Sequence, residues 1–289
     1  MNILSIQSWV TYGHVGNAAA LFPLQRLGAE VWAVNTVQFS NHPGHGSFTG
    51  EVFTGSMVAS LVEGMARLGV LAQVDAVLSG YLGDQATLQA VLDAVQQVRA
   101  LRPDALYCCD PVMGDRGIGL YVQPGIPAML RDQAVAQADI LTPNQFELEQ
   151  LGPEPRDRLH TLAGLVDAAT RLRQLMRPGG ACCVLVTSVD VAETPPEAID
   201  LLLACNRGTL LLRTPRLAVG VNGAGDLIAA LFLFHLRQGG DPVQALELAA
   251  SSVWGILRET GLAGAPELRL VQAQGELVSP SQRFRAELV

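Results

Sequence analysis

Short, continuous apolar runs alternate with amphipathic segments along most of the chain. Apolar runs of about four to eight residues bounded by glycine or polar residues indicate buried strands, whereas apolar positions about three or four residues apart indicate helices. The predicted strands cover residues 2–7, 31–37, 76–81, 106–110, 138–142, 181–187, 199–205 and 208–214. The predicted helices cover roughly residues 16–28, 56–69, 84–101, 161–176, 223–238 and 242–258.

This order predicts an α/β fold, a three-layer sandwich in which helices cover both faces of a mainly parallel sheet. The last two strands are separated by Asn206 and Arg207, the spacing of a hairpin, so we expect an antiparallel edge. No repeat, low-complexity segment or linker interrupts the pattern, and we expect one domain over residues 1–289. In such sheets ligands bind beyond the carboxyl ends of the strands, which makes the polar residues there the candidates for a site.

Apolar residues make up 49% of the chain, enough to fill a large core. The formal net charge of −8 disfavours nucleic acid or an anionic membrane as a partner, because both attract basic patches. No apolar run reaches the roughly 20 residues that a membrane helix needs, and the first residues do not read as a signal peptide. We therefore expect a soluble, cytoplasmic protein that binds neither nucleic acid nor membrane.

All 19 basic residues are arginine. The absence of lysine excludes the Walker A loop, the strand lysine of protein kinases and any Schiff-base enzyme that uses pyridoxal phosphate as cofactor. The cysteines include two adjacent pairs, which suit neither a disulfide framework nor a C-x-x-C zinc site. We interpret all five as small core residues in a reducing compartment: Cys108, Cys109, Cys182, Cys183 and Cys205.

The stretch VNGAGDLIAALFLF places one acid, Asp226, between a glycine-rich turn and an apolar helix. Gly223, Ala224 and Gly225 form a turn whose amides can point at one spot, where the positive end of the helix dipole favours an anion such as a phosphate. Asp226 then falls in the first helical turn, where a carboxylate can accept the proton of an attacking hydroxyl. Taken alone the motif is weak, because a first-turn acid also complements the dipole without any catalytic role.

Two further segments carry acids after predicted strands. In DPVMGDRGIG, Asp110 ends a strand and Asp115 follows in a glycine-rich loop. Such hard oxygen ligands suit Mg²⁺, although Asp115 is equally explained as a turn acid. In TPNQFELE, Asn144 and Glu147 have capping-box spacing, which explains both without a ligand. Together with the other motifs, they become candidates to face nucleotide phosphate and magnesium.

The segment NHPGHG has two histidines three residues apart, His42 and His45, in a polar loop. A third metal ligand is missing nearby, so a transition-metal site is disfavoured. We interpret the loop as a mobile flap beside the site.

In combination, these segments resemble the pyridoxal kinases of the ribokinase-like superfamily. The resemblance covers nearly the whole chain in order: LSIQS, GHVGN and VQFSNH, then LSGYLGD, CDPVMGD, TPNQFELE, VTS and GAGDL. GAGD is typical of the superfamily, whereas the QS…GHVGN and VQFSNH stretches are typical of pyridoxal kinases. The resemblance implies a ribokinase-like fold, a homodimer, and transfer of phosphate from ATP with Mg²⁺ to the 5′-hydroxyl of pyridoxal or a related vitamer.

The resemblance also implies roles for individual residues. Asp226 matches the catalytic base, and the turn from Gly223 through Ala224 to Gly225 matches the anion hole. The residues expected at the substrate are Ser8 on the pyridine ring, Tyr81 in the ring pocket, and His42, Pro43 and Gly44 in the flap. The residues expected at ATP are Asp110, Asn144, Glu147, Thr187 and Ser188 around the phosphates, with Pro215, Arg216 and Leu217 at the adenine. Asp110 and Glu147 are also the expected surroundings of the magnesium ion.

The chain departs from the family pattern at several positions. Pro43 stands where family members usually carry a threonine, so a hydroxyl that can contact the substrate is lost, and Gly44 leaves the flap without a bulky side chain. Trp9 replaces a common histidine, and Leu120 stands nearest to a cysteine that some bacterial members carry. These changes leave the chemistry intact but bear on substrate affinity and vitamer preference.

Three rival functions remain. A hydroxymethylpyrimidine kinase shares the fold and GAGD, but the QFSNH stretch speaks against it. A non-catalytic carrier of pyridoxal phosphate has no need of GAGD, Asp110 and Glu147, although Pro43 keeps this alternative open. An NAD-binding oxidoreductase fits the alternation of strands and helices, but the first βα turn lacks G-x-G-x-x-G.

Overall fold

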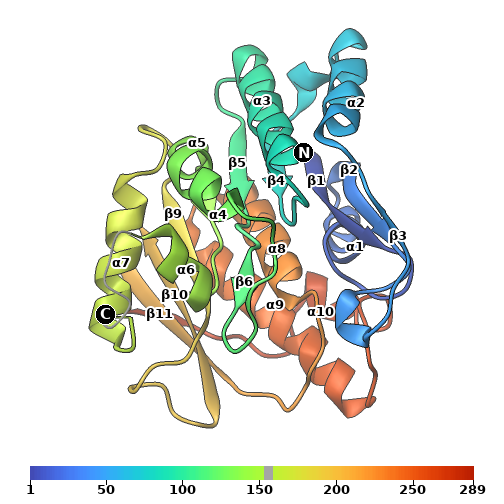
Figure 1. Ribbon diagram of the computed structural model, residues 1–289. Helices are drawn as coiled ribbons and strands as arrows, with labels where there is room; N and C mark the ends of the chain where they lie inside the picture. Colours follow the sequence, from blue (N-terminus) through green and yellow to red (C-terminus); the bar gives the residue numbers. More distant parts are fainter. Residues whose placement is uncertain (153–158) are drawn as a thin grey trace.

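The computed structural model describes residues 1–152 and 159–289 and contains a twisted ten-stranded sheet (Figure 1). The strand order is β12-β11-β10-β9-β8-β5-β4-β1-β2-β3. These strands are β1 (Asn2–Val10), β2 (Glu30–Phe39), β3 (Gly50–Val52), β4 (Ala76–Ser79), β5 (Leu106–Cys109), β8 (Ile140–Leu141), β9 (Cys183–Val189), β10 (Ala198–Cys205), β11 (Gly208–Pro215) and β12 (Ala286–Leu288). A separate small hairpin pairs β6 (Gly114–Asp115) with β7 (Gly119–Leu120).

The strands from β9 to β2 pair in parallel, as the continuous apolar runs predicted. The predicted hairpin is confirmed, since β10 and β11 pair antiparallel around residues 206 and 207. Four short strands were not predicted: β3 adds an antiparallel strand at one edge, β12 adds one at the other, and β6 and β7 form a hairpin in and beside the DPVMGDRGIG loop. Such short strands carry too few residues for a visible period.

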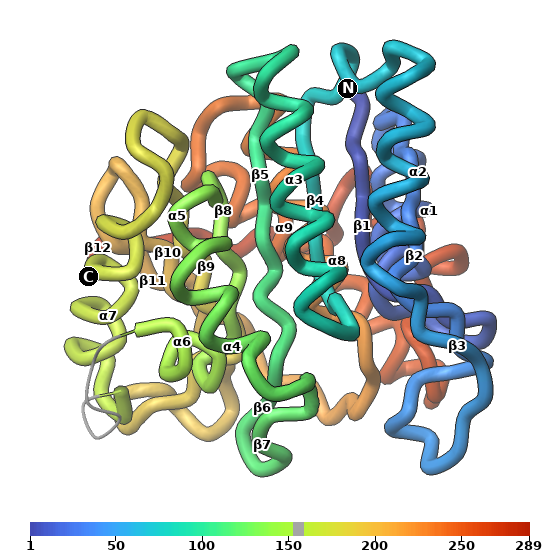
Figure 2. Tube along the Cα trace, turned by 45° about the horizontal axis from the view of Figure 1, so that its top comes forward, coloured from blue at the N-terminus to red at the C-terminus, as the bar shows by residue number. Residues whose placement is uncertain are grey.

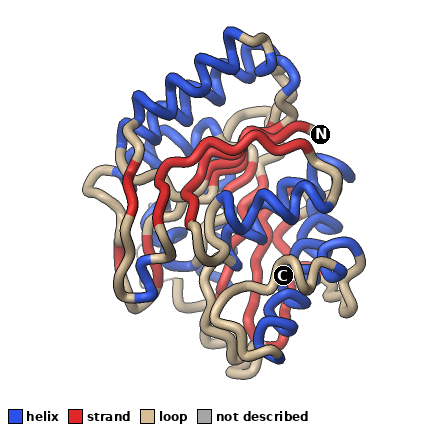
Figure 3. Tube along the Cα trace, turned by 90° about the vertical axis from the view of Figure 1, so that its right-hand side faces the viewer, coloured by secondary structure: helices blue, strands red, loops and turns tan. Residues whose placement is uncertain are grey.

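Helices cover both faces of the sheet, which gives three layers (Figure 3). One face packs against α2 (Gly55–Arg67), α3 (Gln85–Leu101), α4 (Ile126–Met129), α5 (Val135–Gln137), α6 (Gln145–Leu151) and α7 (Leu162–Gln174). The other packs against α1 (Asn17–Arg26), α8 (Ala224–Gly239), α9 (Pro242–Leu262) and α10 (Gly275–Val278). The predicted ribokinase-like three-layer sandwich is therefore confirmed.

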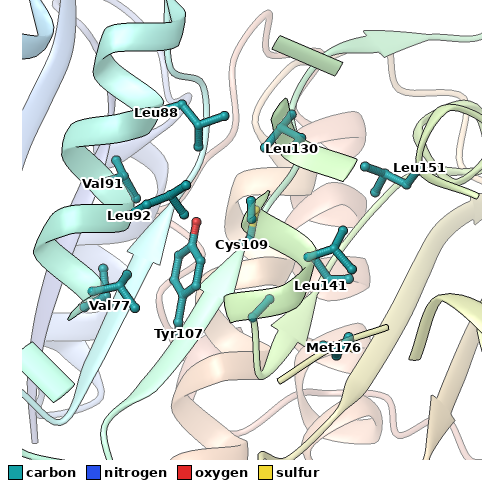
Figure 4. Close-up of a cluster of buried hydrophobic side chains, with 14 of the residues drawn as sticks. Val77, Leu88, Val91, Leu92, Tyr107, Cys109, Leu130, Leu141, Leu151 and Met176 are labelled. Carbon is teal, nitrogen blue, oxygen red and sulfur yellow. The ribbon is translucent and has the colours of Figure 1, made fainter. Parts of the chain in front are cut away.

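Each face of the sheet has its own hydrophobic core. Figure 4 shows part of the first, where the Tyr107 ring lies beside Leu92 of α3. The Tyr107 hydroxyl is satisfied by Ser79 Oγ at 2.9 Å, so its burial leaves no polar group unpaired. The second core centres on α8, in which every residue from Leu227 to Phe234 is buried. The four cysteines other than Cys182 are buried in these cores as predicted.

The prediction holds only in part for Cys182, which packs against the rim of the first core. It is only partly buried and lies just before β9, at a positive φ of 46°. Its Sγ lies 3.2 Å from the Arg177 carbonyl, so Cys182 belongs to the turn that leads into the strand.

Across the described part of the chain, no helix is both long enough and apolar enough to cross a membrane.

Candidate active site

The carboxyl ends of five neighbouring parallel strands form one edge of the sheet (Figure 2). Following the strand order β1, β4, β5, β8, β9, this edge carries in turn Ser8, Tyr81, Asp110, Asn144 and Thr187. The chain order reverses beside β1, which lies between β2 and β4, and this is where open α/β sheets form their binding crevice. The sequence-predicted residues therefore lie in a row, with Ser8 and Tyr81 at one end.

The Ser8 end of the row is tightly packed. Ser8 is buried, and a β-bulge interrupts the pairing of β1 with β2 between Gln7 and Trp9. A Cβ on Gly16 would lie 2.3 Å from the Ser8 carbonyl oxygen, so only glycine fits at this approach of the β1–α1 loop. Tyr81 is half-buried, and burial raises the pKa of its phenol, which keeps the hydroxyl protonated at neutral pH.

A buried polar network fixes the same loop to the sheet. The fully buried Asn17 side chain accepts a hydrogen bond from Ser5 Oγ at 2.7 Å and donates to the Val34 carbonyl at 3.1 Å and to Asn35 Oδ1 at 2.9 Å. These bonds connect the first residue of α1 with both β1 and β2. Because Asn17 is anchored in this way, the preceding Gly16 is held against Ser8 of β1.

Asp226 lies in the first turn of α8, as predicted. The turn before it is tight: Gly223 has a φ of 92°, and a Cβ there would lie 1.7 Å from the His14 carbonyl oxygen. Burial raises the pKa of the Asp226 carboxyl to about 6, although the Gly16 amide and its own amide donate to it and oppose the rise. A carboxyl with this pKa is ionised at neutral pH yet basic enough to accept a proton.

Asp110 and Glu147 form the acidic middle of the row. Thr142 Oγ1 donates to Asp110 Oδ1 at 2.9 Å, and Asp110 is more deeply buried than its place after β5 indicated. Burial, followed by the charges of Glu147 and Asp226, raises the pKa of Asp110 well above its ordinary value. A buried carboxyl whose pKa is raised further by two neighbouring carboxylates favours a compensating cation.

The capping box expected in TPNQFELE is present, and together with the Met113 amide it occupies both oxygens of Glu147. Asn144 Oδ1 accepts from the Glu147 amide at 2.8 Å, and Glu147 Oε2 accepts from the Asn144 amide at 2.9 Å. Glu147 Oε1 accepts from the Met113 amide at 2.9 Å, while Asn144 Nδ2 donates to the Gly114 carbonyl at 2.9 Å. Burial still raises the pKa of Glu147 to about 7. Both residues thus fix the DPVMGD loop against α6.

A cavity of about 320 Å³ lies at the opposite end of the row from Ser8. Thr187 and Ser188 of β9 line it, and Pro215, Arg216, Leu217, Ala224 and Gly225 line it as well, so the structure unites these sequence-predicted residues. Its apolar wall comes from α9, where the indole Nε1 of Trp254 donates to the Pro215 carbonyl at 3.0 Å. Asp110, Asn144, Glu147, Ser8, Tyr81 and the flap do not line this cavity.

The flap is the loop of the β2–β3 hairpin, and it contains a short 3₁₀ turn over Pro43–His45. His42 caps this turn, because its Nδ1 accepts from the Gly44 amide at 3.1 Å; burial lowers the pKa of His42. A Cβ on Gly44 would lie 3.5 Å from the side-chain nitrogen Nδ2 of Asn222, so the flap lies against the residue that precedes the glycine-rich turn. The loop of residues 42–46 therefore lies beside the turn that precedes Asp226, and its role as a flap over a substrate stays a prediction.

Two contributions to the site were missed in the sequence. Trp254 and its neighbours on α9 read as ordinary core positions, because a cavity wall and a core have the same apolar pattern. Glu267 lies in the loop between α9 and α10, yet its carboxylate reaches His14 and His45 on two other loops. No local spacing connects residues so far apart in the chain.

Sequence comparison identifies the family to which this chain belongs. The sequence model of the phosphomethylpyrimidine kinase family matches residues 56–267. A pyridoxal kinase PdxY of Granulibacter bethesdensis is 57% identical over 288 residues, which cover 100% of both chains. The chain belongs to the pyridoxal kinase family. A pyridoxal kinase PdxY of Deinococcus radiodurans is 51% identical over 100% of this chain and 96% of its own length.

Solved structures of pyridoxal kinases share the fold. The pyridoxal kinase of Leishmania donovani in complex with ADP and pyridoxine superimposes with a TM-score of 0.89 at 30% identity, covering 99% of this chain and 98% of that chain. The same protein in complex with ADP and pyridoxamine gives a TM-score of 0.88 at 30% identity, with the same coverage. The chain thus shares the fold of these pyridoxal kinases over nearly its whole length.

Proposed function

We propose that this chain phosphorylates the 5′-hydroxyl of pyridoxal with ATP and that residues 1–289 act as one ribokinase-like kinase domain. The observation that carries the proposal is the position of Asp226. It lies on the tight Gly223 turn, next to the Gly16 loop that packs on Ser8, and its neighbours Ala224 and Gly225 line the cavity at the other end of the row. A hydroxyl bound on one side and a phosphate bound on the other would meet at this carboxylate.

In this mechanism Asp226 accepts the proton of the 5′-hydroxyl while that oxygen attacks the γ-phosphorus of ATP. The bond between the γ-phosphorus and the bridging oxygen breaks, and ADP leaves. Gly223, Ala224 and Gly225 lie at the start of α8, where helix amides have no partner within the helix, and in this mechanism they stabilise the developing charge. The raised pKa of Asp226 matches the proton transfer, because the base is ionised at neutral pH but still proton-accepting.

For the nucleotide, we propose that the adenine occupies the cavity between Trp254 and the segment Pro215, Arg216 and Leu217. The phosphates then extend past Thr187 and Ser188 toward Asn144 and the glycine-rich turn. The polar side chains lie where the positive end of α8 also favours anions.

The acidic middle of the row fits Mg²⁺. Within residues 1–152 and 159–289, no three His, Cys, Asp or Glu side chains form a closed metal site, which agrees with an ion held by few carboxylates plus water and phosphate. We propose Asp110 and Glu147 as these carboxylates, with Glu147 acting through water because backbone amides occupy both its oxygens. When bound, Mg²⁺ would neutralise phosphate charge.

For the substrate, we propose that Ser8 and Tyr81 bind the pyridine ring and that His42, Pro43 and Gly44 cover it. Ser8 lies near the carboxyl end of β1 and Tyr81 just after the adjacent strand β4, so in this proposal a planar ring fits between them at the reversal of strand order. Pro43 offers no hydroxyl, so the flap recognises the ring by shape and backbone alone.

The test is phosphorylation of pyridoxal, pyridoxine, pyridoxamine and hydroxymethylpyrimidine with ATP, by the wild type and by Asp226→Ala. We expect turnover of a B6 vitamer that falls by about 10²–10⁴ in the variant. Turnover of the pyrimidine alone would assign the chain to the rival kinase activity. Tight binding of pyridoxal phosphate without any turnover would support the carrier function. A second measurement with and without a chelator tests the requirement for Mg²⁺.

We also propose a cytoplasmic homodimer. Partly exposed apolar side chains on β3 and α2 support the dimer: Val52, Met57 and Leu61. The five free cysteines suit a reducing compartment. Light scattering after size-exclusion chromatography measures the mass, and a monomer at micromolar concentration would contradict the homodimer.

A further inference from the structure

Glu267 connects two loops at the substrate end of the site. Its side chain is 12% exposed, and it lies in the loop between α9 and α10. Glu267 Oε2 accepts from the His14 amide of the β1–α1 loop at 3.2 Å, and Oε1 lies 2.6 Å from Nε2 of His45 in the flap. Glu267 thus contacts His45, which is 222 residues away in the chain, and His14, which is 253 residues away.

The surroundings of Glu267 are fitted to this carboxylate. A Cβ on Gly13 would lie 2.5 Å from Glu267 Oε2, so the glycine leaves the space that the carboxylate fills. The next residue, Leu268, contacts the catalytic turn, since a Cβ on Gly223 would lie 3.2 Å from its Cδ1. The ring of Tyr12 packs edge-on against His45, with 6.0 Å between the centroids. Glu267 therefore sits where the flap, the β1–α1 loop and the catalytic turn meet.

The rest of the flap is held mainly by itself. Asn41 Nδ2 donates to the carbonyls of His42 and Ser47, which closes the base of the loop. The tip from Pro43 to Gly46 is exposed and buries little apolar surface. The pair of His45 and Glu267 thus adds a short polar contact between this tip and the loop that follows α9.

We propose that Glu267 is a positioning residue that holds the flap over the acceptor substrate through His45. This inference rests on the proposed function for the identity of the substrate. Loss of the carboxylate releases the flap, so the enzyme binds pyridoxal more weakly. The nucleotide cavity lies at the other end of the row, so ATP binding stays as it was.

The experiment compares Glu267→Ala, Glu267→Gln, His45→Ala and the double variant Glu267→Ala/His45→Ala. The matched control is Glu247→Ala. Glu247 is 13% exposed and, like Glu267, accepts from one backbone amide and one basic side chain, but it does so on α9 against residues 285 and 286. Two readouts are used: the KM values for pyridoxal and ATP, and hydrogen exchange of amides 42–47.

We expect Glu267→Ala and His45→Ala each to raise the KM for pyridoxal about tenfold and to leave the KM for ATP within about twofold. The double variant should be no worse than either single one, because both remove the same contact. Glu267→Gln, which keeps the shape and an acceptor, should restore part of the affinity. Exchange of the flap amides should accelerate in the Glu267→Ala variant and stay unchanged in Glu247→Ala.

Unchanged flap exchange in Glu267→Ala would overturn the proposal, and so would faster exchange with an unchanged KM for pyridoxal. An equal rise in both KM values, or the same effects in Glu247→Ala, would show a general loss of structure and would also overturn it. If the wild type turns over no B6 vitamer, the proposed function fails, while the exchange measurement still decides whether Glu267 holds the flap.

Discussion

Replacing Asp226, the proposed catalytic base, should make the protein more stable while it removes activity. Burial raises the pKa of Asp226 from 3.8 to about 6, so ionising it costs more in the folded than in the unfolded chain. A shift of about two units corresponds to ~3 kcal/mol at most, and solvent contact reduces this, so we expect Asp226→Asn to gain about 1–3 kcal/mol at pH 8. The asparagine keeps an acceptor oxygen for the Gly16 amide.

The sign of this effect depends on pH. Because the folded-state pKa is raised, the stability contributed by the protonated carboxyl is present below about pH 4 and is lost as the pH rises through 6. The stability difference between Asp226→Asn and the wild type should thus be small at pH 4, grow up to pH 6 and stay level above it. Denaturant unfolding at several pH values measures it, with the exposed Glu63→Gln as a control expected to change stability by less than about 0.5 kcal/mol. A variant that is no more stable than the wild type at pH 8, or equally stabilised at pH 4 and 8, would refute the reasoning.

Further predictions concern the pH profile, the glycine-rich turn, the nucleotide cavity and the fold. The wild-type kcat/KM should rise with pH to an apparent pKa of about 6 and then level off, since Asp226 must be ionised to act as base; a flat profile from pH 5 to 8 would contradict this role. Gly223→Ala should destabilise the protein by more than about 1 kcal/mol in thermal unfolding because its φ is 92° and its Cβ meets a carbonyl, whereas Gly225→Ala, with open space around its Cβ, should unfold like the wild type. Trp254→Phe should raise the KM for ATP several-fold without changing that for pyridoxal, because it removes the indole donor at the cavity wall. Asp139→Asn should cost about 3–5 kcal/mol in denaturant unfolding, since this fully buried carboxylate pairs with two arginines.

Much of the fold could be predicted because the long elements carry strong periodic patterns. The helix expected at 84–101 is α3 at Gln85–Leu101, capped by Asp84, and the hairpin around residues 206 and 207 is present. The apolar run after Asp226 does form a buried helix, with glycine at each end. Short strands such as β3 and β12 were missed, because their pairing depends on distant partners and not on a local period.

The candidate site also contains residues that local sequence predicts and residues that it does not. Residues that directly follow strands or begin helices, such as Asp110 and Asp226, could be predicted because a short local motif indicates their position. The rise in the pKa of Asp110 that Glu147 and Asp226 cause could not be predicted, since it depends on how three separate segments converge. Glu267 is the extreme case, because its partners are set only by the folded chain.

The strand order also fixes the distance between the two ends of the row. Ser8 and Thr187 belong to strands that are four steps apart in the sheet, and neighbouring strands lie about 4.8 Å apart, so the two ends of the row are separated by roughly 19 Å. Backbone hydrogen bonds set this spacing, so no single side chain controls it. Substitutions in the loops can therefore change which alcohol is accepted. In the proposed binding mode, the strand order limits the combined length of acceptor and nucleotide. A longer acceptor would need a different sheet or a different place for its far end, and not merely a wider pocket.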